Sequence, residues 1–168
     1  ANHFLYDWLH CVDLGVAAHA MGNVLYDVVF NRLRHLGRTR ALSDVMNYLL
    51  TQSPEHGSEV RNMELKKFCN EKSHLSTYPV MAGYKAAEIR GLMPAVAALA
   101  RDFSDGSADH RHQASMMTAL ENMYDHMHTS GMLMGDKYPE FERATTTFLL
   151  EYNWLANQSL EVVPYVHR

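Results

Sequence analysis

Apolar residues recur every three or four positions along most of the chain, which is the period of an amphipathic helix. The helices that this pattern predicts cover about residues 9–36, 40–51, 58–69, 82–103, 108–129 and 136–160. Residues 1–6 and 162–167 are short stretches with an extended apolar pattern. The sequence therefore predicts an all-α fold, an irregular bundle of about six helices with short extended termini.

The stretch at about 82–103 has the sharpest periodicity, so we expect it at the centre of the core. Its apolar stripe consists of Ile89, Leu92, Met93, Val96, Leu99 and Phe103. Gly91 and Pro94 lie inside it, and proline removes a helical hydrogen bond, which predicts a kink or break near Gly91. We also expect Gly37 to end the first helix and the polar stretch 70–83 to be a loop.

The helix predicted at about 108–129 is rich in methionine and histidine. Its apolar stripe is formed by Met116, Leu120, Met123, Tyr124 and Met127. A methionine stripe at helical spacing is more often adaptable core than an interface, so we expect core packing here. Histidines occupy positions 110, 112, 126 and 128. Because residues two apart do not share a helix face, no histidine metal site is expected.

The composition fits one helical domain over residues 1–168, since 47% of the residues are hydrophobic and 20% are charged. The net charge of -4 gives no overall attraction to nucleic acid, so any contact with DNA must be local. No long apolar run and no basic-plus-apolar leader is present, so we expect neither a membrane span nor secretion. The chain starts at Ala1 without methionine, so we expect an excerpt from a larger protein.

Two cysteines, Cys11 and Cys69, both lie inside helical patterns. They fit buried free thiols of a reducing compartment better than a disulfide framework. No Cys-x-x-Cys pair is present, so a structural zinc site is not expected.

The candidate chemistry lies at the start of the chain, where Asp7 and His10 are followed by Asp13. Residues three apart project from one side of a helical turn, so these side chains would act together. A carboxylate is the ligand that Mg²⁺ or Mn²⁺ prefers, and an imidazole nearby can orient it or move a proton. The alternative is structural: Asp7 caps a helix and His10 packs in the core.

Three stretches resemble the DDE-type cut-and-paste transposases of the CACTA and Kyakuja-Dileera-Zisupton type. The first is Asp-x-x-His followed by Cys-Val-Asp-Leu-Gly-Val at 7–16, and the second is Tyr-Lys-Ala-Ala-Glu-Ile-Arg at 84–90. The third combines Tyr-Asn-Trp-Leu-Ala at 152–156 with Pro-Tyr-Val-His at 164–167. The matches occur in the order of the family and span nearly the whole chain.

The resemblance implies that Asp7 is the second catalytic carboxylate and a metal ligand, with His10 as its helper. In the family such a helical block is inserted into a ribonuclease-H-like fold between the second catalytic Asp and the catalytic Glu. The cofactor implied for the full protein is Mg²⁺ or Mn²⁺. One carboxylate cannot hold two metal ions, so the isolated chain is expected to bind none and to be inactive. The implied location is nuclear or otherwise intracellular.

Several basic residues are candidates for contact with DNA. Arg32, Arg34, Arg38 and Arg40 cluster near the end of the first predicted helix. They either complement the helix C-terminus or form a phosphate-binding patch. From their spacing alone, Lys85 and Arg90 are expected on an exposed helix face that carries ion pairs. The resemblance implies instead that they contact DNA or pack against the catalytic domain. His167 matches the family's histidine, but Tyr165 replaces the family's lysine, which weakens the case for a phosphate contact there.

The partners expected from the resemblance are DNA, bound weakly through the local basic patch, and the remainder of the transposase catalytic domain. Homo-oligomer formation is left open, and no membrane partner is expected. The competing interpretation is a non-enzymatic α-helical interaction module, from a decayed or domesticated element or from an unrelated protein. In that case Asp7 and His10 are a helix cap and a packed imidazole.

Overall fold

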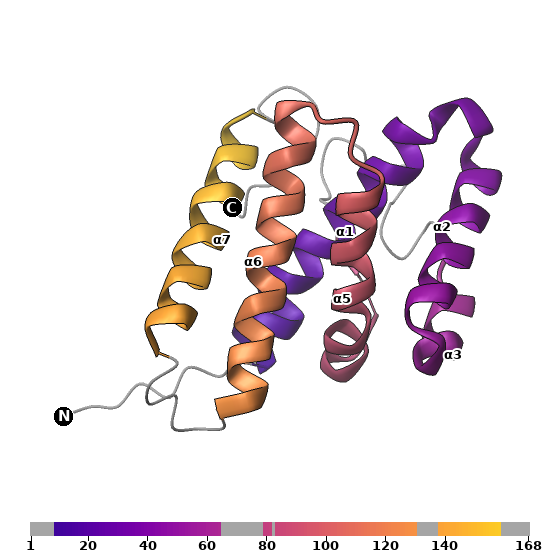
Figure 1. Ribbon diagram of the computed structural model, residues 1–168. Coiled ribbons are helices and arrows are strands. Elements are labelled where there is room, and N and C mark those ends of the chain that lie inside the picture. Colours follow the sequence, from indigo (N-terminus) through magenta and orange to yellow (C-terminus); the bar gives the residue numbers. More distant parts are fainter. Residues whose placement is uncertain (1–8, 65–78, 82, 131–137, 159–168) are drawn as a thin grey trace.

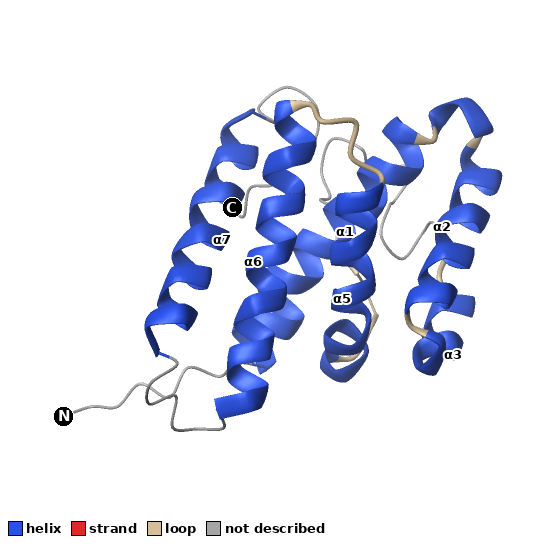
Figure 2. Cartoon of the chain, viewed as in Figure 1, coloured by secondary structure: helices blue, strands red, loops and turns tan. Residues whose placement is uncertain are grey.

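The computed structural model describes residues 9–64, 79–81, 83–130 and 138–158. Its elements are η1 (Leu9–Ala17), α1 (Ala18–Asp27), η2 (Val28–Arg32), η3 (Arg34–Leu36), α2 (Arg38–Gln52), η4 (Pro54–His56), α3 (Gly57–Arg61), α5 (Ala86–Asp102), α6 (Ala108–Ser130) and α7 (Tyr138–Gln158). The described residues contain helices and no strand, so the all-α prediction is confirmed (Figure 2). The extended stretches predicted at the two ends lie outside the described residues.

The first predicted helix, 9–36, is helical nearly throughout but changes type along its length. It begins as the wide π-type segment η1, which departs from helical geometry at Gly15 (φ -96°, ψ -109°). Regular helix α1 follows, and η2 widens again, with the Leu33 amide donating to the Val28 carbonyl five residues earlier at 2.9 Å. The helical run ends at Gly37 as predicted, because its φ of 76° suits glycine and few other residues.

The helices are arranged side by side around α5. Helix α7 packs on α6, α6 packs on α5, and α5 also contacts η1, α1 and α2. In Figure 1 helices α7, α6, α5 and α2 follow one another across the view, and α1 crosses behind α6 and α5. Helix α7 therefore lies at one edge of the described bundle and α2 at the other.

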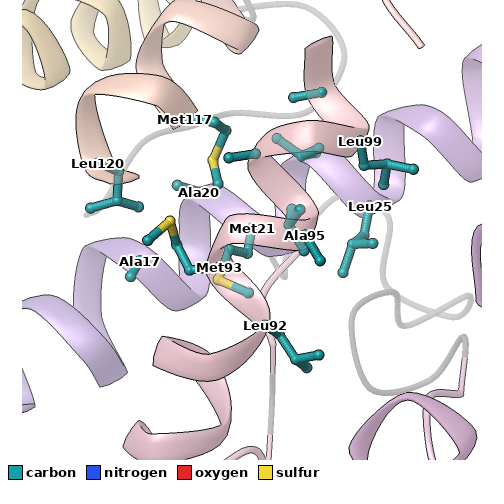
Figure 3. Packing of buried hydrophobic residues seen from close by; sticks show 14 of the residues in the cluster. Ala17, Ala20, Met21, Leu25, Leu92, Met93, Ala95, Leu99, Met117 and Leu120 are labelled. Atoms are coloured by element: carbon teal, nitrogen blue, oxygen red, sulfur yellow. The ribbon is translucent and has the colours of Figure 1, made fainter. Parts of the chain in front are cut away.

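Helix α5 is the centre of the core, as its periodicity predicts. Its stripe residues from Ile89 to Leu99 are at most 1% exposed. The alanines beside the stripe, such as Ala95 and Ala97, are also buried and let neighbouring helices approach closely. Figure 3 shows Met21 and Leu25 from α1 and Met117 and Leu120 from α6 gathered around this helix. The methionine stripe of α6 is core from Met116 to Tyr124, as expected, and Met127 at its end is partly buried.

Helix α5 continues through Gly91 and Pro94, so of the predicted kink or break the break is absent. The glycine has a different role, because the imidazole of His56 lies directly over it and occupies the space where a Cβ would project. Helix α5 begins after Lys85, whose backbone N–H donates to the Glu88 carboxylate at 2.7 Å. Glu88 therefore caps the N-terminus of the helix.

Residues 79–81 lie against α1 as an extended strap. The Met81 amide donates to the Ala18 carbonyl at 3.1 Å, and the Asn23 side chain donates to the Pro79 carbonyl at 3.4 Å. A Cβ on Gly22 would lie 2.5 Å from the Cα of Val80. The close approach of two backbones at this point therefore requires glycine.

Two local predictions are wrong. Within the described residues the third helix ends at Arg61, and a turn follows in which the Met63 amide donates to the Val60 carbonyl. Val60 and Met63 are buried as their spacing suggests, but this turn suffices to bury both. Cys11 is an exposed free thiol and not a buried one, because it lies on the outward side of η1. Cys69 lies outside the described residues.

Helix α7 covers most of the last predicted helix, with Pro139 in its first turn. Ala144, Phe148 and Leu155 form its buried side. No helix in the described part of the chain is both long enough and apolar enough to cross a membrane.

Candidate functional site

The structure does not test whether Asp7 and His10 lie close together. Asp7 and His167 lie outside the described residues, and for His10 only the backbone, in η1, is described. Because a π-type helix has more residues per turn than an α-helix, residues three apart in η1 share a face less closely than expected.

Asp13, the fifth residue of η1, forms a buried polar network with two other helices. Its carboxylate is fully buried. Oδ2 accepts a hydrogen bond from Nη2 of Arg90 on α5 at 2.5 Å, and Oδ1 accepts one from the hydroxyl of Tyr124 on α6. One carboxylate therefore joins η1, α5 and α6. We call Asp13, Arg90 and Tyr124 the Asp13 network.

The charge of Asp13 is neutralised inside the network. A buried carboxylate is costly unless it is paired and hydrogen-bonded, and Asp13 has both kinds of partner. A metal ion at Asp13 would have to approach the positive charge of Arg90, which repels it. Asp13 therefore does not act with Asp7 and His10 as a metal ligand.

Tyr124 remains a neutral donor at physiological pH. Burial raises the pKa of its hydroxyl far above the ordinary value, and the hydrogen bond to Asp13 and the charge of Asp13 raise it further, while Arg90 lowers it. The sequence assigned Tyr124 only to the apolar stripe of its helix. Its polar partner is 111 residues away in the chain, so no local pattern could reveal it.

The predicted DNA-binding arginines divide into two groups. Arg32 is turned inward: its side chain is 6% exposed, and Nε bonds Asp27 at 2.7 Å. Its other nitrogens bond the Phe103 carbonyl at 3.1 Å and the Gln113 side chain. Arg32 thus ties η2 to the end of α5 and to α6, and its guanidinium does not face solvent.

Arg34, Arg38 and Arg40 are exposed around Gly37, where η3 ends and α2 begins. We call these three residues the basic patch. The guanidinium of Arg38 lies 5.2 Å from the centre of the Phe30 ring, and Nε of Arg40 lies 3.4 Å from Asp44. Lys85 is also exposed, whereas Arg90 is half exposed and belongs to the Asp13 network.

A second polar cluster, which the sequence did not suggest, joins α6 to α7. Glu151 accepts a hydrogen bond from the Ser115 hydroxyl at 2.9 Å and contacts Nδ1 of His112. The His112 ring stacks on Trp154, with 3.7 Å between ring centres. Although serine, histidine and a carboxylate meet here, Ser115 bonds the carboxylate and not the imidazole, so the arrangement is not that of a serine–histidine catalytic pair. The cluster fastens α7 to α6.

Next to this cluster is an open groove of about 380 Å³ between α6 and α7. Arg101 at the end of α5 and Arg143 of α7 line it, together with alanine and hydroxyl side chains of α6 and α7. Arg101 is bound to Glu121 at 2.8 Å and to the Thr118 hydroxyl at 3.2 Å. The lining of the groove is therefore mainly apolar, and the charge of Arg101 on it is already paired with Glu121.

The structure brings two of the three resembling stretches together. Asp13 belongs to the first stretch and Arg90 to the second, and they form the buried ion pair. The part of the third stretch at 152–156 lies on α7, where Trp154 packs on His112 of α6, apart from the Asp13 network.

Among the described residues, no three His, Cys, Asp or Glu side chains converge to hold a metal ion. No protein-family model, curated protein or solved structure matches this chain.

Proposed function

We propose that this chain is the helical insertion region of a transposase-like protein of the CACTA or Kyakuja-Dileera-Zisupton type. In the full protein it contributes Asp7, with His10 as its helper, to metal-dependent cleavage and transfer of DNA strands. The remaining carboxylates come from the rest of the catalytic domain. One carboxylate does not make a two-metal site, so no step of the reaction is assigned to this chain alone.

The observation that carries the proposal is the ion pair between Asp13 and Arg90. Two stretches that resemble the same family are 77 residues apart in sequence, yet their charged residues meet in one buried contact. A contact between the two stretches is what a common structural unit requires. The pair therefore supports the view that both stretches belong to one structural unit, built around the segment that follows Asp7.

The competing function is a non-enzymatic helical interaction module. Its support is that Asp13, Arg32 and Glu88 have structural roles that need no chemistry. A cleavage assay distinguishes the two functions: the full-length protein is incubated with DNA and Mg²⁺ or Mn²⁺. We expect strand cleavage by the full-length protein and none by residues 1–168 alone. A full-length protein that folds but leaves DNA intact with either metal would favour the module.

The basic patch is the proposed contact with DNA. Three exposed arginines on a chain of net charge -4 support weak, sequence-independent binding to phosphates. Replacing Arg34, Arg38 and Arg40 by glutamine should lower the affinity of the chain for duplex DNA about tenfold. The slope of log affinity against log salt should fall by about 2–3, since each lost phosphate contact accounts for about 0.9. Fluorescence anisotropy at several salt concentrations measures both quantities.

The matched control replaces Arg61, Arg111 and Arg143, three exposed arginines elsewhere in the fold, by glutamine. It removes the same net charge but leaves the basic patch intact. If the control weakens binding as much as the patch variant does, the attraction is not localised at the patch. Tight, salt-insensitive binding to a single sequence would also contradict the proposal.

A further inference from the structure

We propose that Asp13, Arg90 and Tyr124 are positioning residues that fix the η1 segment, which begins two residues after Asp7, against helices α5 and α6. This inference rests on the proposed function, because it deepens the role of the same corner. The three residues would act through the placement of η1, without touching DNA or metal themselves.

The backbone of η1 needs such an anchor. It is a π-type segment with a non-helical residue at Gly15, so a regular ladder of i→i+4 hydrogen bonds does not define its path. Cys11 and Leu14 are exposed, whereas Asp13 and Ala17 are buried. Among the side chains of η1 that the structure describes, from Cys11 to Ala17, Asp13 is the buried one with directional contacts to other helices.

The two contacts of Asp13 fix its orientation as well as its position. Each carboxylate oxygen accepts from a different helix, Oδ2 from Arg90 on α5 and Oδ1 from Tyr124 on α6. A rotation of the carboxylate breaks at least one of these bonds. A movement of η1 away from the bundle breaks both and leaves buried polar groups without partners, which is costly. The network therefore permits one placement of η1.

Tyr124 gives the sharpest test of this inference. It lies on α6, outside the three resembling stretches, and its hydroxyl can be removed without changing a charge or the aromatic ring. Tyr48 is a matched control, because its hydroxyl donates to Asp102 at 2.6 Å on the exposed side of α2. Tyr124→Phe and Tyr48→Phe thus each delete one hydroxyl-to-carboxylate hydrogen bond. Of the two lost bonds, the one in Tyr124→Phe had its acceptor in η1.

Hydrogen exchange in the full-length protein measures the placement directly. In Tyr124→Phe, amides of residues 9–17 should exchange about tenfold faster, while those of α1 and α5 stay as in the parent. Tyr48→Phe should leave residues 9–17 unchanged. Asp13→Asn, which keeps the shape but removes the charge, should act in the same direction as Tyr124→Phe. Equal acceleration in all helices, or none in residues 9–17, would overturn the inference.

The rate of strand cleavage is the second measurement. A lower rate in a fully folded variant cannot result from general destabilisation. The kcat of Tyr124→Phe should fall about tenfold at a temperature where the variant is fully folded, with DNA affinity unchanged. If Asp7→Asn stops cleavage but Tyr124→Phe changes neither kcat nor exchange, the positioning inference alone is wrong. If Asp7→Asn cleaves like the parent, the proposed function is wrong, and the exchange experiment still decides whether the network holds η1.

Discussion

Replacing Asp7 with asparagine in the full-length protein should lower the rate of strand cleavage by about 10³-fold or more. Asparagine keeps the size of the side chain but lacks the negative charge that attracts Mg²⁺ or Mn²⁺. Because the change is nearly isosteric, the free energy of unfolding should change by less than about 0.5 kcal/mol. Cleavage assays with each metal and thermal unfolding of the same samples measure the two effects.

The control is Asp109→Asn, which removes the same charge from an exposed position at the start of α6. It should cleave DNA like the parent. If Asp7→Asn also cleaves like the parent, Asp7 is not a catalytic ligand. If Asp7→Asn unfolds the protein, Asp7 is structural. Either outcome favours the helical interaction module.

Gly22→Ala should destabilise the fold by about 2 kcal/mol, although the same change inside a helix is usually stabilising. Helix propensity favours alanine by about 1 kcal/mol. The new Cβ would lie 2.5 Å from the Cα of Val80, however, and backbone atoms cannot turn away as a side chain can. Pushing the 79–81 strap off α1 costs about 3 kcal/mol. Subtracting the gain in helix propensity leaves a net loss of about 2 kcal/mol, so the melting temperature should fall by about 4–8 °C.

Gly57→Ala is the matched control for Gly22→Ala. Gly57 is also a helical glycine, but a Cβ there would meet its nearest neighbours at 3.5 Å, an ordinary contact. Its melting temperature should stay the same or rise. A Gly22→Ala variant as stable as the parent would mean that the strap does not lie against α1 as described. Differential scanning calorimetry compares the three proteins.

The sequence predicted the helices well wherever an apolar stripe decides burial. The α5 stripe from Ile89 to Leu99 and the α6 residues Met116 and Met123 are buried because hydrophobic periodicity acts over neighbouring turns, which the sequence displays directly. It predicted the end of the first helical run at Gly37 for a similar reason, since a positive φ selects glycine locally. It missed the shortening of α3, because a turn buries Val60 and Met63 as well as a helix does.

Contacts between residues far apart in the chain could not be predicted from the sequence. Arg32 carries the same charge as the residues of the basic patch, and only the fold reveals that Gln113 and the Phe103 carbonyl hold it inward. Gly91 resembled a helix breaker, but its smallness accommodates the imidazole of His56. The Asp13 network likewise depends on Tyr124, which sequence spacing assigned to the core. The expected pair Asp7 and His10 stays a prediction.

The exposed thiol of Cys11 has a consequence for inhibitor and metal chemistry. It adjoins His10 in sequence, so thiol-modifying reagents would attach their bulk to the Asp-x-x-His segment. Thiolates also prefer soft ions such as Zn²⁺ to the hard Mg²⁺. If an alkylating agent or added Zn²⁺ lowers activity, the reaction of Cys11 is therefore the first explanation to test, ahead of an effect at Asp7. Cys11→Ser is accordingly the background in which the proposed metal site at Asp7 can be tested without interference from this thiol.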